Sequence, residues 1–478
     1  MDRGSSAASS TGTGPVPAGA STGRPTGPPC TRSWTIDHPF PRETTVARVT
    51  ARTPAPPVVA DAPAPPPAPS PGPPRHVAVA GAGLAATQTV AALREAGFDG
   101  RVTVLGAETV PPYDRPPLSK HLLDRPRPTW LADEVGADLR TLADDVRLGT
   151  PASGLVVTGA GVELATPHGA VAADAVVLAT GAAAVRPAGW SAALTLHTAD
   201  DARVLRERLG PGARLVVIGA GWIGAEVAGV AAAAGVDVTV VEAAAGPLGS
   251  ALGTAVGGLT APWYAAAGVR LLCDAQVVDV RADGVTLADG QVLPADVVLA
   301  AVGARPATAW LAGALPRETD GSLRVDEGFA VVGAPRHVRA VGDVALRRSA
   351  RHGWVPGGHW DGALRGPEVL VADLLGVAGV LADVAPYVFS TQLGHELALF
   401  GQPGPDDDVV LRGDPSGGDG WTAVWFRPGA DDAAAILTVD RPRDVGAARR
   451  LFGARDLPRL DRRLVRDLAH PLRETALT

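Results

Sequence analysis

Two glycine-rich turns are the segments of this sequence with the most specific chemistry. They read Gly81-Ala-Gly83-Leu-Ala-Ala86 and Gly219-Ala-Gly221-Trp-Ile-Gly224. Glycines at these positions let the backbone turn tightly and approach a pyrophosphate, which then lies at the positive N-terminus of the following helix. Because the chain has 58 glycines, one such motif alone is weak evidence, and the neighbouring elements decide its meaning.

Both turns occur in the setting of a nucleotide-binding unit. An apolar strand is expected at 76–80, then a helix to about residue 96 and a second strand at 101–105. The same order recurs at 214–218, a helix to about residue 234, and 237–241. Each unit of about 30 residues therefore predicts a βαβ dinucleotide fold. Two ordinary strand–turn–helix units that bind no nucleotide are the alternative.

An acidic residue at the end of the second strand distinguishes the two nicotinamide cofactors. Glu242 follows Gly219 by 23 residues, and the next three residues are alanines. A carboxylate there binds the ribose hydroxyls and repels a 2′-phosphate, so the sequence predicts NADH rather than NADPH. In the first unit the corresponding acid is less regular, and Glu108 is the candidate ribose ligand.

Lys120 is the only lysine of the chain, since the other 42 of the 43 basic residues are arginines. Because the chain uses arginine almost everywhere else, a single lysine suggests a position that requires an ammonium group rather than the broader guanidinium of arginine. Chance survival of one lysine is the alternative.

The elements that position these residues are those of an α/β protein, with an α+β region after about residue 386. In that region strands are expected at 409–412, 421–427 and 434–439, with a helix near 445–452. Residues 1–74 contain 18 prolines and are expected to be a disordered tail whose role the sequence leaves open.

Composition excludes several other classes of protein. The net charge of −7 argues against a nucleic-acid partner, and no apolar run reaches the length of a membrane span. The N-terminus lacks the apolar core of a signal peptide, so a cytoplasmic location is expected. The two cysteines, Cys30 and Cys273, are too few for an iron–sulfur cluster and too far apart for a Cys-x-x-Cys disulfide. No metal site is expected.

Several longer motifs resemble one family. They are Pro112-Tyr-Asp-Arg-Pro-Pro-Leu-Ser-Lys120, Ala179-Thr-Gly-Ala182, Val302-Gly-Ala-Arg-Pro306, Val341-Gly-Asp-Val-Ala345, His359-Trp-Asp361, Val410-Leu-Arg-Gly-Asp414 and Val439-Asp-Arg-Pro-Arg-Asp444. With the two turns, they make residues 75 to about 475 similar to the FAD-dependent ferredoxin, rubredoxin and putidaredoxin reductases.

The resemblance implies a domain plan. It has two Rossmann-like dinucleotide-binding domains and a C-terminal α+β domain. The FAD domain would be discontinuous, at 75–197 and 320–385, with the NAD domain inserted at 198–319. The C-terminal reductase domain would occupy 386–478.

The resemblance also implies roles for single residues. Arg115 and Lys120 would line the flavin, Glu226 would pair with Lys120 beside the nicotinamide, and Asp343 would bind the FAD ribityl chain. The further cofactor-binding positions would be Thr180, Gly181, Gly303, His359 and Trp360. The implied activity is that of a ferredoxin–NAD(+) reductase, with FAD and NADH as cofactors and a small iron–sulfur carrier, ferredoxin or rubredoxin, as partner. The physiological acceptor and the oligomeric state stay open.

Some residues depart from the family pattern. Ala107 stands at the usual place of the ribose acid, Gly358 replaces a glutamate, and Val388-Phe389-Ser390 replaces Phe-Trp-Ser. These departures affect the expected flavin surroundings but leave the hydride path in place.

Three questions stay open from sequence. The arginines between Arg347 and Arg351 form either a docking surface for an acidic partner or a solvated loop. An NADH oxidase, peroxidase or coenzyme A disulfide reductase is an alternative enzyme, although no cysteine lies in the segment Leu118-Ser119-Lys120. A redox-quiet nucleotide-binding regulatory protein is the second alternative.

Overall fold

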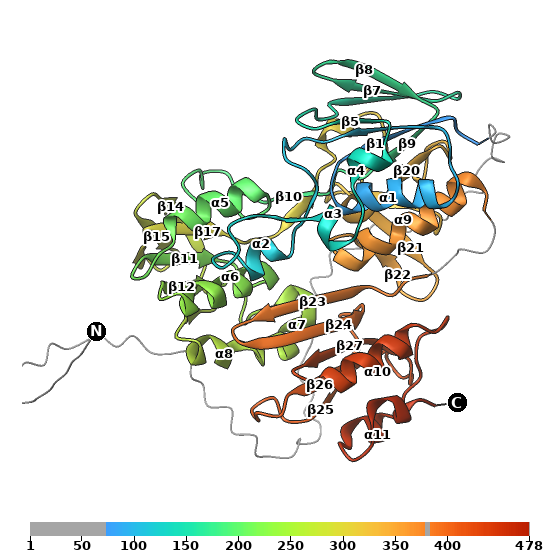
Figure 1. Ribbon diagram of the computed structural model, residues 1–478. Helices are drawn as coiled ribbons and strands as arrows, with labels where there is room; N and C mark the ends of the chain where they lie inside the picture. Colours follow the sequence, from blue (N-terminus) through green and yellow to red (C-terminus); the bar gives the residue numbers. More distant parts are fainter. Residues whose placement is uncertain (1–72, 378–382, 478) are drawn as a thin grey trace, which may run out of the picture. The chain divides into compact units, whose positions relative to one another are not determined.

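The computed structural model describes residues 73–377 and 383–477 (Figure 1). The prediction of a disordered tail at 1–74 therefore falls almost wholly outside the described residues.

The first glycine-rich turn belongs to a five-stranded parallel sheet with the order β20-β9-β1-β2-β5. The central strand has alternating valines and alanines that are buried on both faces, as expected for a strand covered on two sides. Strand β20 comes from far along the chain, so this unit is discontinuous. The main elements are β1 (His76–Ala80), α1 (Leu84–Glu95), β2 (Arg101–Leu105), β5 (Asp145–Arg147), β9 (Ala175–Leu178), β20 (Val338–Ala340) and α9 (Trp360–Leu375).

The second turn belongs to a four-stranded parallel sheet with the order β13-β12-β11-β17. Its helix follows the turn directly, and the next strand returns parallel beside the first. The elements are β11 (Arg214–Ile218), α6 (Trp222–Ala233), β12 (Asp237–Val241), α7 (Gly249–Gly258), α8 (Ala261–Ala266), β13 (Arg270–Leu272) and β17 (Val297–Ala300).

Smaller elements repeat in the two units and connect them. Each unit has a three-stranded antiparallel sheet, and the ribbon β10-β18 pairs a segment after the first unit with one after the second. The sheets are β6 (Gly154–Val157), β7 (Val162–Thr166) and β8 (Gly169–Ala173); β14 (Val277–Arg281), β15 (Gly284–Leu287) and β16 (Val292–Pro294); and β10 (Ala182–Ala184) with β18 (Ala304–Pro306).

The remaining short elements lie near the candidate site or support it. The strands are β3 (Tyr113–Asp114), β4 (Thr129–Trp130), β19 (Leu323–Val325), β21 (Ala345–Ser349) and β22 (Gly353–Val355). The helices are α2 (Pro117–Lys120), α3 (Leu131–Glu134), α4 (Leu139–Leu142) and α5 (Ala199–Arg208), with 3-10 turns at Ala309–Leu311 and Gly342–Val344.

The C-terminal part is an antiparallel sheet with the order β23-β24-β27-β26-β25, drawn in orange and red in Figure 1. The predicted strands near 409, 421 and 434 are present, and β23 and β24 precede them. The elements are β23 (Tyr387–Gln392), β24 (His395–Gly401), β25 (Asp408–Arg412), β26 (Trp421–Phe426), β27 (Ala433–Val439), α10 (Pro442–Phe452), α11 (Arg462–Arg466) and a 3-10 turn at Leu472–Thr475.

The two faces of this sheet pack on different partners. Alternate residues of β24 point to opposite sides because the side chains of a strand have a period of two. Phe400 packs with Phe452 of α10, whereas Leu399 packs with Leu252 and Trp263 of α7 and α8. The C-terminal sheet is therefore packed directly against the helices of the second unit.

Candidate active site

The two glycine-rich turns are built alike. Gly81 has a φ of 118°, and a Cβ there would lie 2.1 Å from the carbonyl oxygen of Ala179. Gly219 has a φ of 103°, and a Cβ there would lie 2.5 Å from the carbonyl oxygen of Ala301. Only glycine permits both the positive φ and this close approach. Each turn therefore packs on the backbone that follows a neighbouring parallel strand.

The helices after the two turns begin with backbone N–H groups that no side chain caps. Helices α1 and α6 start after Gly83 and Gly221, with no side-chain hydrogen bond at the cap and no acidic residue in the first turn. Helix α5 differs, because Thr198 and Asp201 close its N-terminus with a reciprocal capping box. Uncapped N–H groups and the helix dipole favour an anion. The turns of both units thus fit the pyrophosphate of a dinucleotide.

The third position of each turn differs between the units. A Cβ at Gly224 would lie 2.0 Å from the carbonyl oxygen of Gly219, so the second turn requires glycine there. In the first turn Ala86 occupies this position and is fully buried. The first turn accommodates one methyl group, as the sequence motif permits.

Glu242 lies at the second turn. One carboxylate oxygen accepts from the backbone N–H of Ala220 at 2.7 Å, and the other from that of Ala244 at 2.8 Å. These two hydrogen bonds hold the carboxylate beside the turn, where it can also accept from ribose hydroxyls. The geometry fits an adenosine ribose without a 2′-phosphate.

Glu108 of the first unit has different partners. Its carboxylate accepts from the Tyr113 hydroxyl at 2.6 Å and pairs with Arg115 at 2.9 Å. Arg115 also donates to the backbone carbonyl of His197, directly before α5. Arg115 thus joins the first unit to the segment that leads into the second, and the cofactor roles of Glu108 and Arg115 stay predictions.

Lys120 and Glu226 meet between the units. Lys120 ends α2, Glu226 lies in α6, and the ammonium group pairs with the carboxylate. The side chains are only 12% and 5% exposed. A buried charge needs a partner to offset its lost hydration, and each of these groups provides one for the other. The structure brings together the two residues that the sequence placed in the hydride-transfer site.

An aromatic ring packs against the Lys120 end of this pair. The Lys120 ammonium lies 5.1 Å from the ring centroid of Phe389, and Trp360 meets the same ring edge-on. Trp360 Nε1 donates to Asp114 at 2.7 Å. Burial raises the pKa of Asp114, and this hydrogen bond opposes the rise. The predicted cofactor residue Trp360 therefore lies next to Phe389, the ring that contacts Lys120.

Asp343 and His359 lie close to each other. Asp343 accepts from the backbone N–H of Gly358 at 3.1 Å. A Cβ at Gly357 would lie 2.5 Å from the Asp343 Cα, so this loop lies directly on Asp343. Burial lowers the pKa of His359, and the charge of Asp343 opposes part of this decrease. The imidazole is therefore neutral at pH 7. Its Nδ1 is buried without a hydrogen-bond partner among the described residues, which fits contact with a bound polar group.

Thr180, Gly181 and Gly303 lie where the chain passes between the two units. The Thr180 hydroxyl donates to the carbonyl of Ala307 at 2.9 Å, and the Gly181 carbonyl accepts from the N–H of the same residue at 2.8 Å. Gly303 has a φ of 110° directly before β18. These three residues shape the connection, and their cofactor contacts stay predictions.

Comparison with known proteins identifies the family of this chain. The model of the pyridine nucleotide-disulphide oxidoreductases matches residues 75–363. The chain belongs to the pyridine nucleotide-disulphide oxidoreductase family. The model of the reductase C-terminal domain matches residues 387–476. The chain is therefore an oxidoreductase, and the family resemblance and fold class expected from the sequence are confirmed.

Similar members of this oxidoreductase family match over nearly their whole length. The ferredoxin–NAD(+) reductase component of the anthranilate 1,2-dioxygenase system of Burkholderia cepacia is 34% identical over 399 residues, which cover 80% of this chain and 94% of that protein. The ferredoxin reductase for the CYP199A2 system from Rhodopseudomonas palustris has a TM-score of 0.76 and 28% identity, over 84% of this chain and 100% of that one. Putidaredoxin reductase, in its covalent complex with putidaredoxin, has a TM-score of 0.72 and 27% identity, over 84% and 98%.

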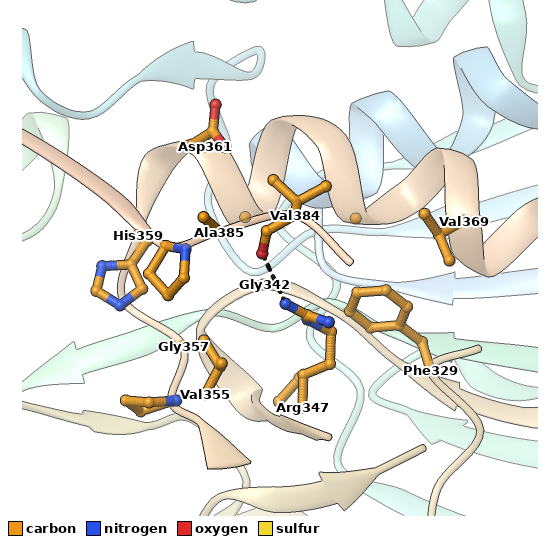
Figure 2. Close-up of a pocket in the computed structure, with 15 residues that line it drawn as sticks. Phe329, Gly342, Arg347, Val355, Gly357, His359, Asp361, Val369, Val384 and Ala385 are labelled. Carbon is orange, nitrogen blue, oxygen red and sulfur yellow. Dashed lines mark hydrogen bonds between the residues drawn. The ribbon is translucent and has the colours of Figure 1, made fainter. Parts of the chain in front are cut away.

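Two arginines of the segment 347–351 of this oxidoreductase point inward, whereas Arg348 between them is 65% exposed, as the solvated-loop alternative expected. The Arg347 side chain is 12% exposed and pairs with Asp383 at 2.8 Å. It also donates to the carbonyl of Val384, the hydrogen bond drawn in Figure 2. Arg351 is 7% exposed and donates to the carbonyl of Phe452 at 3.0 Å. The docking surface and the solvated loop are therefore both wrong for these two arginines. Arg351 fastens helix α10 of the C-terminal part to the first unit, whereas Arg347 binds the segment 383–384 that leads into that part.

A small cavity lies beside the predicted cofactor residue His359 (Figure 2). It lies between α9 and the segment 384–386, has a volume of about 50 Å³ and is bordered by His359 and Asp361. That volume accommodates water but not a flavin ring. Burial raises the pKa of Asp361, which the charge of Arg365 opposes.

Sequence reasoning missed several residues at this oxidoreductase site. Ser119 and Ser390 both donate to Glu226, and Phe389 packs beside Lys120. Phe389 and Ser390 lie in the segment that corresponds to the family's Phe-Trp-Ser, and Ser390 keeps the serine of that pattern. The match of this segment to the family pattern was the available signal.

Proposed function

We propose that this chain is an NADH-dependent flavoprotein reductase that passes electrons through FAD to a small iron–sulfur carrier, ferredoxin or rubredoxin. The observation that supports it best is the buried Lys120–Glu226 pair, which links the first nucleotide-binding unit to the second. A site between two dinucleotide units is where a nicotinamide and a flavin would meet.

The two cofactors would be held by different units. The turn at Gly81 and Gly83, with Asp343 and His359, would hold FAD. The turn at 219–224 and the Glu242 carboxylate would hold NADH. The proposal keeps the boundaries 75–197 and 320–385 for the FAD domain, 198–319 for the NAD domain and 386–478 for the C-terminal domain.

Catalysis would depend mainly on orientation. When bound, FAD supplies the chemistry of accepting a hydride from NADH and releasing the two electrons singly. Glu226 would orient the nicotinamide together with Lys120. The Lys120 ammonium would stabilise the negative charge that develops on the flavin. The Lys120–Glu226 pair is largely buried, with Phe389 against the ammonium group, and low water content strengthens this electrostatic effect.

The proposed partner follows from cysteine content and from the relatives. The chain has two cysteines, so any iron–sulfur cluster would lie on another protein. The similar proteins are named as ferredoxin reductases of oxygenase systems or as putidaredoxin reductase. No helix in the part of the chain that the structure describes is long and apolar enough to cross a bilayer. A cytoplasmic location is part of the proposal.

An anaerobic assay with a panel of carriers tests this function. Purified protein should be yellow. Its flavin absorbance should be lost when NADH is mixed in, and should be lost far more slowly with NADPH. Reduction of cytochrome c by NADH should then require an added ferredoxin or rubredoxin. A colourless protein that takes up no FAD would contradict the proposal. Bleaching without electron transfer to any carrier would favour the NADH oxidase or peroxidase alternative, and no bleaching at all would favour the regulatory protein.

A further inference from the structure

Glu226 is bound by side chains from three separate parts of the chain. Ser119 donates to one carboxylate oxygen, while Lys120 and Ser390 both donate to the other. The distance from the Ser390 hydroxyl to the carboxylate is 2.5 Å. Ser390 lies in β23 of the C-terminal sheet and is 1% exposed. The C-terminal domain therefore contributes a hydroxyl group directly to the buried ion pair.

The direction of the Ser390 hydroxyl is fixed by Gln392. The amide nitrogen of this glutamine donates to the Ser390 oxygen at 3.0 Å, and the glutamine is also 1% exposed. Because an ionised carboxylate only accepts hydrogen bonds, the Ser390 proton points to Glu226. The result is a chain of donors from Gln392 through Ser390 to the carboxylate.

Strand β23 is also held close to α6 by its backbone. A Cβ at Gly229 would lie 2.8 Å from the backbone nitrogen of Leu393, which directly follows β23. Gly229 is three residues after Glu226 and therefore lies on the same side of the helix. Figure 1 shows β23 extending to α6, and the two elements are in contact. The position of Ser390 against Glu226 is thus fixed by packing as well as by hydrogen bonds.

We propose that Ser390 is a positioning residue of the hydride-transfer site. Its hydroxyl, oriented by Gln392, holds the Glu226 carboxylate against Lys120, and β23 covers the pair. The C-terminal domain would then shape the reductive step as well as stabilise the fold. The expected effect of Ser390 on flavin reduction rests on the proposed function. The contacts through which Ser390 positions Glu226 do not depend on that function.

The first test is kinetic. The variant Ser390→Ala removes the hydroxyl, and Ser390→Thr keeps one. Thr391→Ala is the matched control, because it removes a hydroxyl from the next residue of β23, on the opposite, exposed face. In anaerobic rapid mixing, Ser390→Ala should lower the limiting rate of flavin reduction by NADH about tenfold, the effect of one lost hydrogen bond to a charged group. The Kd for NADH should change little, Ser390→Thr should restore most of the rate, and Thr391→Ala should match wild type.

The second test does not use the flavin reaction. Since Lys120 is the only lysine, acetylation of its side chain can be followed by peptide mass spectrometry, with the amino terminus as internal reference. In wild type the amine should react slowly, because it is paired and covered. Ser390→Ala should raise its rate of acetylation about tenfold relative to that reference, and Thr391→Ala should leave it unchanged. Gly229→Ala displaces β23 without altering any donor, so it should also raise the rate.

The two tests separate the inference from the proposed function. If wild-type protein is not reduced by NADH, the function fails, and the acetylation rates alone decide the role of Ser390. If wild type is reduced as expected, an unchanged limiting rate in Ser390→Ala overturns the inference. Acetylation of Lys120 at the wild-type rate in Ser390→Ala also overturns it.

Discussion

Lys120 and Glu226 are 106 positions apart in the sequence and form a buried ion pair between α2 and α6. Removing one partner would leave an uncompensated charge in a water-poor site, at a cost of about 3–5 kcal/mol. The pair therefore fixes the position of α2 against α6, the helix that follows the second glycine-rich turn. Its position between the two units is what makes it the centre of the proposed reductase site.

The Glu242 carboxylate should determine the choice of nicotinamide cofactor. Glu242→Gln keeps a similar shape but removes the negative charge, so repulsion of a 2′-phosphate should disappear. We expect kcat/KM for NADH to fall about tenfold and that for NADPH to rise, measured by flavin reduction with both cofactors. Asp279→Asn, a half-buried change in β14 of the same unit, is the control. An NADH preference equal to that of wild type would exclude this role of Glu242.

Sequence could predict the local features of the site. The two turns, their strands and their helices follow from glycine spacing and apolar runs, and Glu242 follows from its place after a strand. Lys120 and Glu226 were paired through the family resemblance. The strand that carries Ser390 was not predicted as a strand, although the β-rich character of its region was. Its residues are only partly buried on one side, so the periodic signal of β23 is weak.

Long-range contacts could not be predicted from the sequence. Arg347 and Arg351 appear as a surface charge cluster when only neighbouring residues are considered. Their partners come from 383–384 and from the end of α10, and nothing in the local pattern indicates them. Glu108 is a different case, since its carboxylate binds Tyr113 and Arg115, which are near it in the sequence, rather than the first glycine-rich turn.

His352 should make stability depend on pH. It is 5% exposed, and burial lowers its pKa from 6.5 to about 4, with the charge of Arg351 adding to the effect and that of Asp383 opposing it. As the pH falls, the unfolded chain binds a proton on this residue before the folded one does. The stabilisation is therefore complete above pH 6.5 and is lost between pH 6.5 and 4, by about 3 kcal/mol.

Urea denaturation at a series of pH values measures this dependence. His352→Leu replaces the imidazole with an apolar group of similar size, so its free energy of unfolding should vary less between pH 6.5 and 4. His168→Leu is the control, because His168 is exposed in the turn between β7 and β8. An equal slope in wild type and His352→Leu would refute the assignment.

Arg412 should be essential for the C-terminal domain. Its side chain is 2% exposed, and it donates to the carbonyls of Val465, Asp467 and His470 while it lies 3.4 Å from Asp444. Arg412→Ala leaves those carbonyls without their donor and removes one of the two arginines that pair with the buried Asp444 carboxylate, so it should lower the free energy of unfolding by about 3–5 kcal/mol. Arg443→Ala, an exposed change in α10, should stay within about 0.5 kcal/mol of wild type. Denaturation followed by tryptophan fluorescence compares them, and equal midpoints would contradict the structural role of Arg412.

The most direct test of the central claim is anaerobic rapid mixing of NADH with the FAD-loaded Lys120→Met variant, observed at the flavin absorbance band. Methionine keeps the length of the side chain and removes its charge. If the Lys120–Glu226 pair forms the hydride-transfer site, the limiting rate of flavin reduction should fall by about 10²-fold relative to wild type, with FAD still bound. Reduction of the variant at the wild-type rate would contradict the account.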